Sequence, residues 1–333
     1  MQDGKKLKNQ KMKKILLAAL LMSVLVSCKN QDWEFPDFPY QTVYFAYQAP
    51  IRTITLGEDI FDTSLDNAYK CKIMATAGGA YTTKADVSID VAIDNTLAQN
   101  LLFSGGGDNI IPMPASYYSL ASDRIIIPKG EITGGVEVQL TDAFFADPLA
   151  IKNTYVIPLK MTKVTNADSI HSTKSYVLYA LKYVNPWHGN YLRRGKDVIT
   201  GKSGSSIANK TVVRHKEFVE KDELSTLSTQ SLSSTRLPLV FPDANGQNIN
   251  CELVLTFDNA GNCNISSGSN GITATGKGSF VKKGEKNSWG AKDRDAIYVN
   301  YEIDMPQMRV ASTDTLVLRD RGVTMATFSP VSK

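Results

Sequence analysis

Two pairs of carboxylates near the C-terminus have a spacing that acid–base catalysis could use. Asp293 and Asp295 are two residues apart, as are Glu302 and Asp304, and side chains two residues apart on a strand lie on the same face. Two carboxylates in one cleft would suit hydrolysis of a glycosidic bond. Such pairs also occur on the solvated face of any sheet, and this is the interpretation we favour. Because the chain also lacks Gly-x-Ser-x-Gly, phosphate-binding-loop and His-Glu-x-x-His motifs, we predict no catalytic residues and no enzymatic activity.

Aromatic side chains give a stronger indication of binding. A sugar ring presents an apolar face of C–H groups, and Trp and Tyr offer a flat surface with a polar tip that suits it. Trp289 lies in a polar loop, and loops on a rigid scaffold carry function; the alternative is that it plugs one end of its domain. Trp187 and Tyr191 lie near a predicted domain junction. We predict Trp289, Trp187 and Tyr191 as residues that bind a glycan.

Metal and cofactor sites are not indicated by the sequence. Asp86, Asp90 and Asp94 would share one face of a strand, but they do not form the Asp-x-Asp-x-Asp-Gly loop of a calcium site. The cysteines and histidines lack the spacing of zinc ligands. We therefore predict no bound metal and no cofactor.

Three cysteines beyond the N-terminal segment are predicted to be free thiols. Cys251 and Cys263 flank a turn at residues 258–261. A hairpin centred on this turn would place Cys251 opposite a residue near position 268, so a cross-strand disulfide with Cys263 is disfavoured. Together with Cys71, these residues are expected to be buried and unpaired.

Charged residues occur near both ends of the predicted second domain. Arg193 and Arg194 lie close to its start, and residues 319–321 read Arg-Asp-Arg. Guanidinium groups could fork onto sugar hydroxyls or carboxylates. A closed barrel requires its first and last strands to pair, and we therefore favour a salt bridge between them. His188 is predicted to fix a turn by hydrogen bonds rather than to contact a ligand.

The N-terminal segment combines a lysine-rich stretch, an apolar run at residues 15–26 and a cysteine. The apolar run is much shorter than the ~20 residues of a membrane-spanning helix, and the three parts are those of a secretory signal. Residues 25–28, Leu-Val-Ser-Cys, resemble the end of a bacterial lipoprotein signal. This resemblance implies that residues 1–27 are removed, that the Cys28 thiol is lipidated and that acyl chains anchor the product to a membrane.

The positive net charge of the chain resides in this signal. The formal net charge is +4, but residues 1–27 contribute +5 through six lysines and Asp3, so the remaining chain carries −1. A basic surface for nucleic acid is therefore not indicated, and we predict no nucleic-acid partner.

Beyond the signal, the chain is predicted to be all-β and to contain two domains. Residues 28–39 form a polar, proline-containing tether. About eight short strands predict an immunoglobulin-like β-sandwich over residues 40–184, in which Pro158 indicates an edge strand or a bulge. A meander of hairpins over residues 185–333 predicts a lipocalin-like antiparallel β-barrel or a sandwich, with residues 323–328 as its last strand.

Several segments resemble a known family. In the first domain they resemble the immunoglobulin-like N-terminal domain of Bacteroidetes surface lipoproteins, a domain of unknown function also found ahead of some family 18 glycosidases. In the second they look like the C-terminal β domain of unknown function that often follows it. The resemblance implies an outer-membrane lipoprotein of a polysaccharide-utilisation system that faces the cell exterior, without assigned catalytic residues. The segments are residues 43–45, 126–131, 136–140 and 155–159 in the first domain, and 183–195 and 316–322 in the second.

We therefore predict a non-catalytic, lipid-anchored cell-surface protein that binds a glycan, either an oligosaccharide or a polysaccharide. The alternative is a structural or interaction lipoprotein that docks on an outer-membrane partner protein. A concave, aromatic-lined cleft would favour the first function, and an exposed, contiguous apolar patch would favour the second. A glycoside hydrolase would instead need two carboxylates about 5 to 9 Å apart in one cleft.

Overall fold

The computed structural model describes residues 40–79 and 82–333. The signal at residues 1–27, the lipidation site Cys28 and the rest of the tether at residues 28–39 lie outside the described residues. Within the described ranges, no helix is long and apolar enough to cross a membrane. Regular structure is nearly all β, and the predicted fold class is confirmed.

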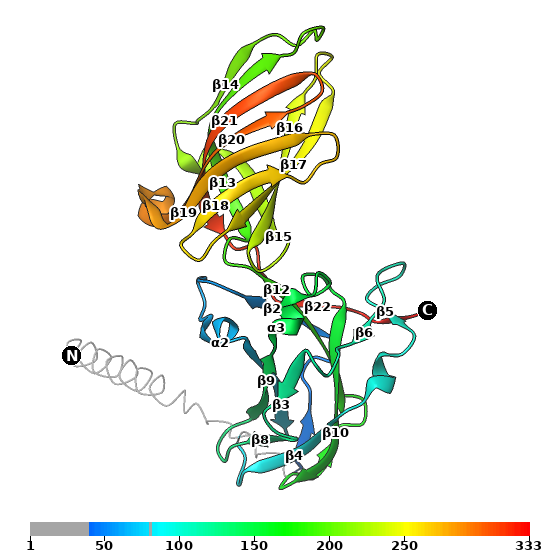
Figure 1. Ribbon diagram of the computed structural model, residues 1–333. Coiled ribbons are helices and arrows are strands. Elements are labelled where there is room, and N and C mark those ends of the chain that lie inside the picture. Colours follow the sequence, from blue (N-terminus) through cyan, green and yellow to red (C-terminus); the bar gives the residue numbers. More distant parts are fainter. Residues whose placement is uncertain (1–39, 80–81) are drawn as a thin grey trace, which may run out of the picture. The chain divides into compact units, whose positions relative to one another are not determined.

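The segment up to Val184 contributes the strands of two sheets that share one core, as in a sandwich (Figure 1). One sheet has the strand order β11-β1-β3-β9-β7, and the other has the order β22-β2-β12-β10-β4-β8, with β6 paired to β10. The strands of the first sheet are β1 (Thr42–Tyr44), β3 (Lys70–Gly78), β7 (Tyr118–Leu120), β9 (Thr133–Leu140) and β11 (Ser169–Ile170). Those of the second are β2 (Pro50–Thr55), β4 (Val87–Ile93), β6 (Ile111–Pro112), β8 (Arg124–Ile127), β10 (Tyr155–Thr165), β12 (Tyr176–Val184) and β22 (Ala326–Thr327).

Short elements connect these strands. They are the helices α2 (Ser64–Asn67) and α3 (Asp142–Ala146), the 3-10 turn η1 (Asn95–Ala98), and β5 (Leu101–Leu102), which pairs with β23 (Val331–Ser332).

Burial along the strands follows from what covers each face. Strands β4 and β9 alternate between buried and more exposed residues because one of their faces lies on the core. In β10 and β12, by contrast, residues 155–159 and 177–181 are all buried. The second sheet is covered on both sides, since residues from 98 to 110 pack against Val156 and Leu178 on the side away from the main core.

Pro158 lies on a central strand, and the expectation of an edge or bulge at this residue is wrong. Its strand, β10, pairs with β12 on one side and β4 on the other, and the register shift falls between Met161 and Lys163. The Pro158 carbonyl accepts a hydrogen bond from the Asp94 N–H, just beyond the end of β4. The N and C=O of one strand residue point to the same side, so the missing donor faces a position where the ladder has already ended.

The second part of the chain forms a closed eight-stranded antiparallel barrel (Figure 1). Strands β13 and β15 to β21 follow one another around the ring, and β13 pairs with β21 to close it. Strand β14 pairs with the second half of β13. The bounds are β13 (Gly189–Gly201), β14 (Lys210–Arg214), η2 (Val219–Lys221), β15 (Glu223–Thr229), β16 (Ser234–Pro242), β17 (Asn248–Phe257), β18 (Asn262–Ser267), β19 (Thr273–Ser288), η3 (Trp289–Ala291), β20 (Lys292–Asp304) and β21 (Met308–Asp320).

The hairpin predicted around residues 258–261 is present, and its register keeps the cysteines apart. Phe257 is the residue opposite Cys263, and Leu253 is opposite Ser267, so Cys251 and Cys263 are not a cross-strand pair. Both residues and Cys71 are free and buried, which confirms the prediction.

The last strands of the chain pair with the sandwich segment and not with the barrel. Residues 322–333, which we call the C-terminal tail, leave β21 and form β22 and β23. Strand β22 pairs with β2, with Ala326 opposite Ile51, and the Phe328 N–H donates to the Ala49 carbonyl at 2.9 Å. The sequence analysis instead predicts residues 323–328 as a strand of the second domain. The tail occupies the edge of β2, which would otherwise expose unpaired backbone groups.

A buried ion network joins the two strands that close the barrel. Arg193 on β13 donates from Nε to Asp314 Oδ2 on β21 at 2.9 Å, and from Nη2 to the Tyr301 hydroxyl at 3.0 Å. Arg214 on β14 forms a second ion pair with Asp314. Gly195 permits this close approach, because a Cβ at that position would lie 2.3 Å from Asp314 Oδ1. The salt bridge predicted between the first and last strands is therefore present.

Replacing Arg193 with Met should destabilise the protein by about 3 kcal/mol, because it leaves a buried carboxylate with one cation fewer. Urea unfolding at pH 7 measures this loss. The matched control is Arg309→Met, since Arg309 is exposed and pairs with Asp304 on the surface; its loss should stay within about 1 kcal/mol. Equal losses for the two variants would show that the network does not stabilise the barrel.

Candidate functional site

Two of the predicted binding residues, Trp187 and Tyr191, take part in packing at the start of the barrel. The Trp187 ring stacks on Phe257, with ring centroids 4.1 Å apart and an interplanar angle of 8°. Tyr191 is 0% exposed, and its hydroxyl donates to the Trp187 carbonyl at 3.0 Å. One face of Trp187 is thus covered, and Tyr191 has no surface that a ligand could contact.

Trp289 is half-buried and belongs to a separate set of contacts. Its Nε1 donates to the Leu318 carbonyl on β21 at 3.2 Å, and the Arg294 guanidinium lies 3.5 Å from the ring centroid. This cation–π contact covers one ring face. Trp289 ties the β19–β20 loop to the barrel wall, and these contacts do not include Trp187 or Tyr191.

The carboxylate pairs are on the surface and make local contacts. The Asn287 N–H and the Lys286 ammonium hold the pKa of Asp293 below its ordinary value. The Lys202 ammonium lowers the pKa of Asp304. A general acid for glycoside cleavage needs the opposite shift, so these contacts favour the solvated-face interpretation.

The three aspartates that would share a strand face are engaged separately. Asp86 accepts from the Lys129 N–H, Asp90 pairs with Arg124, and Asp94 accepts from the Thr96 N–H at the start of η1. Among residues 40–79 and 82–333, no group of three His, Cys, Asp or Glu side chains is placed to hold a metal ion.

His188 fixes the turn between the sandwich and the barrel, as the sequence predicts. Its Nδ1 accepts from the Thr229 N–H at 3.2 Å, and its own N–H donates to the Asn185 carbonyl. Burial, followed by the charges of Arg321 and Lys182, lowers the pKa of His188 to about 4. The imidazole is therefore neutral at pH 7, with its proton on Nε2.

Arg321 holds the end of the barrel to this turn and to the loop after β2. It is 3% exposed, and its guanidinium donates to the carbonyls of His188, Glu58, Leu56 and Asn185 at 2.7–3.0 Å. Its partners are thus backbone dipoles; the salt bridge predicted for the arginine-rich segments is made inside the barrel instead. The C-terminal tail begins at the next residue.

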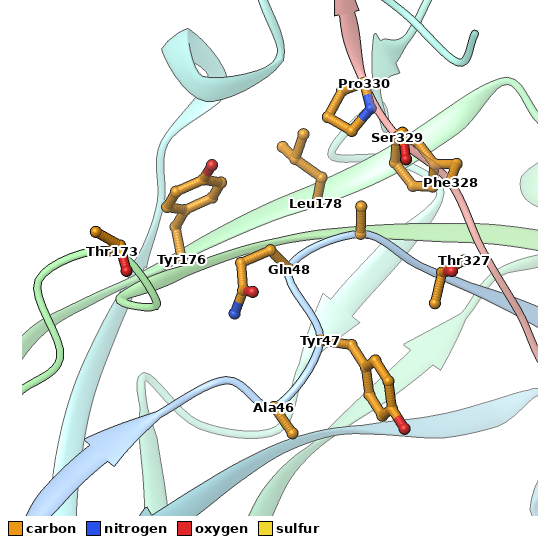
Figure 2. A pocket seen from close by; sticks show the side chains of 11 residues that line it. Ala46, Tyr47, Gln48, Thr173, Tyr176, Leu178, Thr327, Phe328, Ser329 and Pro330 are labelled. Carbon is orange, nitrogen blue, oxygen red and sulfur yellow. The ribbon is translucent and has the colours of Figure 1, made fainter.

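A groove of about 510 Å³ in the sandwich segment has the features of a binding site for a small molecule (Figure 2). Its lining comes from three parts of the chain: residues 46–49, residues 173–178 and the C-terminal tail. Backbone hydrogen bonds from Leu178 to Gln48 and from Phe328 to Ala49 hold these parts together. The volume falls within the roughly 300–1,000 Å³ of typical ligand pockets.

Three aromatic rings line this groove. Tyr47 is 53% exposed, and Tyr176 and Phe328 are half-buried. Phe328 packs on Phe103, with centroids 4.8 Å apart, which fixes the tail against the sheet. The hydroxyls of Tyr47 and Tyr176 make no hydrogen bond to the residues that the structure describes, so they are available to a ligand.

Sequence reasoning misses the groove because its parts are far apart in the chain. Tyr47 and Tyr176 are 129 positions apart, and Phe328 lies in a segment predicted to belong to the other domain. A local signal exists only in Tyr47, an aromatic residue in the short connection between two strands.

Acidification should destabilise the protein through His188. The unfolded state takes up a proton as the pH falls below about 6.5, whereas the folded state does so only near pH 4. Stability present above pH 6.5 is therefore lost as the pH falls toward 4. Between pH 7.5 and 5, His188→Asn should lose about 2 kcal/mol less than the unaltered protein in urea unfolding.

The control for this experiment is His215→Asn, since His215 is exposed on the barrel. That variant should keep the full pH dependence. An unchanged pH dependence in His188→Asn would show that His188 is not protected from protonation.

Two family models match the chain. Residues 186–322 match a domain of unknown function, DUF5627, and this range contains the whole barrel. Residues 38–168 match a model described as an N-terminal domain. None of the curated proteins compared matches the chain.

Solved structures of Bacteroides proteins are also similar. An auxiliary nutrient-binding protein from Bacteroides thetaiotaomicron is 15% identical, with a TM-score of 0.40 and coverage of 80% of this chain and 90% of that one. A candidate carbohydrate-binding protein from Bacteroides ovatus is 12% identical, with a TM-score of 0.31 and coverage of 87% and 99%. Likenesses at these TM-scores carry no argument about this chain.

A third structure, of a Bacteroides ovatus protein of unknown function, is much more similar. It is 46% identical, with a TM-score of 0.82, and the alignment covers 88% of this chain and 99% of that one. The identity extends over the sandwich and the barrel together. The chain therefore belongs to the same family as this Bacteroides ovatus protein, and its barrel is a DUF5627 domain.

Proposed function

We propose that the protein binds a carbohydrate, without cleaving it, in the groove lined by Tyr47, Tyr176 and Phe328. The observation that carries this proposal is the gathering of three aromatic rings around one concavity of suitable size. Aromatic rings contact the C–H face of a sugar, and tyrosine hydroxyls bind its hydroxyl rim. The proposal moves the site from the barrel, where Trp187, Tyr191 and Trp289 are engaged in packing, to the sandwich.

The composition of the groove supports binding without catalysis. None of its eleven lining residues is an Asp, Glu, His, Cys, Lys or Arg. Cleavage of a glycosidic bond needs two carboxyl groups at the bond, and the groove offers hydroxyl groups and the Gln48 amide instead. The absence of charged side chains among them favours a neutral sugar over an acidic one.

A glycan-array screen of the purified protein, followed by isothermal titration of a hit, tests this function. Tyr47→Ala and Tyr176→Ala should each weaken binding roughly three- to tenfold, which corresponds to about 0.5–1.5 kcal/mol for an aromatic contact. Tyr40→Ala is the matched control, because Tyr40 is equally exposed but does not line the groove. A hit that is unaffected by both groove variants would reject this site, and a released product would reject the non-catalytic function.

We also propose that Cys28 carries the lipid anchor and that the protein lies on the outer membrane, facing the cell exterior. The support is the sequence of residues 1–28 together with the Bacteroides relative. Cys28→Ala should abolish incorporation of labelled palmitate and release the protein from the membrane fraction. Cys71→Ala, which alters a buried thiol, should leave both unchanged; retention of label in Cys28→Ala would contradict the proposal.

A second function, docking on an outer-membrane partner protein, is favoured by one loop. Ile60 is fully exposed, Phe61 is 41% exposed, and Leu65 on the adjacent helix α2 is 38% exposed. Large apolar side chains that lie together on a surface mark interaction sites. A photo-crosslinking residue at position 60, used in intact cells, would trap such a partner; the absence of any adduct would reject docking through this loop.

A further inference from the structure

A second, smaller pocket lies beside the junction turn. It has a volume of about 200 Å³, and its lining includes residues of β2 and β12, His188 and the first residues of the C-terminal tail. It shares no lining residue with the aromatic groove. The pocket is below the roughly 300 Å³ at which sites for drug-sized molecules begin, so it can take only a small ligand.

Lys182 gives this pocket its distinctive chemistry. It lies on β12 opposite Thr53 of β2, and it is half-buried. Its ammonium forms no ion pair with any carboxylate in the described part of the chain. A partly buried charge without a partner is unfavourable, and burial correspondingly lowers the pKa of Lys182.

The surroundings of Lys182 add positive charge and no negative charge. No Asp or Glu lines the pocket, and the nearby guanidinium of Arg321 is fully engaged with four carbonyl groups. The charges of Arg321 and Lys182 also contribute to the low pKa of His188. The neutral imidazole keeps a proton on Nε2, which is a second hydrogen-bond donor beside the ammonium.

The other walls are mainly apolar. Ile51, Ile151, Val184 and Val323 line the pocket together with the hydroxyls of two threonines. A phosphate or sulfate has oxygen atoms on all sides, and apolar walls would leave several of them without donors. A ligand with one anionic end and an apolar body would satisfy both parts of the pocket.

We propose that this pocket binds a small organic carboxylate, with the carboxylate on the Lys182 ammonium and the body against the apolar wall. The arrangement combines a charge-assisted hydrogen bond with burial of C–H surface. The site goes beyond carbohydrate binding and does not rest on it, since the two cavities have different residues and different charge.

The test uses butyrate as the probe and follows binding to the purified protein by NMR titration. 1-Butanol has the same apolar body without the charge, and inorganic phosphate has charge without the body. Butyrate should bind saturably, and the other two should bind at least about tenfold more weakly, because each lacks one of the two contacts. Equal binding of phosphate or butanol, or no saturable butyrate binding, would overturn the proposal.

Lys182→Gln should weaken butyrate binding about tenfold or more, since it removes a hydrogen bond to a charged group. The control is Lys72→Gln, which alters an exposed lysine on β3 and should leave the affinity unchanged. Lys182→Gln should also unfold at the same or a higher temperature, because it removes an unpaired, half-buried charge. Butyrate binding that survives in Lys182→Gln would place the ligand elsewhere.

A second measurement reads the site without a variant of Lys182. A carboxylate in the pocket would offset the field of the ammonium and raise the pKa of His188, which is measured from its imidazole resonances with and without butyrate. An unchanged pKa at saturating butyrate would reject the site. Tyr47→Ala should leave both butyrate readouts unaltered, so failure of the aromatic groove as a carbohydrate site is distinguished from failure of this pocket.

Discussion

The hydrogen bonds of Arg321 are the constraint on which much of the described structure depends. This guanidinium is buried without a carboxylate, and four backbone carbonyls share its charge. The carbonyls belong to the loop after β2 and to the turn that begins the barrel. One side chain at the end of β21 therefore connects the last barrel strand to both. A lysine could not replace it, because it lacks the planar fork that reaches several acceptors at once.

The path of the C-terminal tail follows from this connection. The tail leaves the barrel at Arg321 and adds β22 to the free edge of β2. Its first residues line the small cationic pocket, and its later residues line the aromatic groove. Both candidate sites thus use the same segment as a wall, and the packing of Phe328 on Phe103 holds that wall in place. Domains that are separate in sequence supply side chains to one set of cavities.

Particular residues show how far local patterns can predict this protein. The alternation in β4 and β9, the hairpin register that separates Cys251 from Cys263, and the hydrogen-bonded turn at His188 were all accessible, because each depends on neighbouring residues. Trp187 and Tyr191 were not: their residue types suit a sugar, but packing against Phe257 and burial in the barrel use the same surfaces. Tyr47 has the same chemistry and remains exposed. Residue type alone does not distinguish these cases.

The sequence by itself determined the β periodicity, the two-part organisation and the lipoprotein-like signal, since each is written in adjacent residues. Tertiary structure decided that β13 meets β21 to close a barrel, that residues 322–333 return to the sandwich, and which aromatic and cationic side chains remain free. The physical reason is that alternation fixes only which side chains share a face. What covers that face depends on contacts between residues more than a hundred positions apart, such as Arg193 with Asp314 and Arg321 with Leu56.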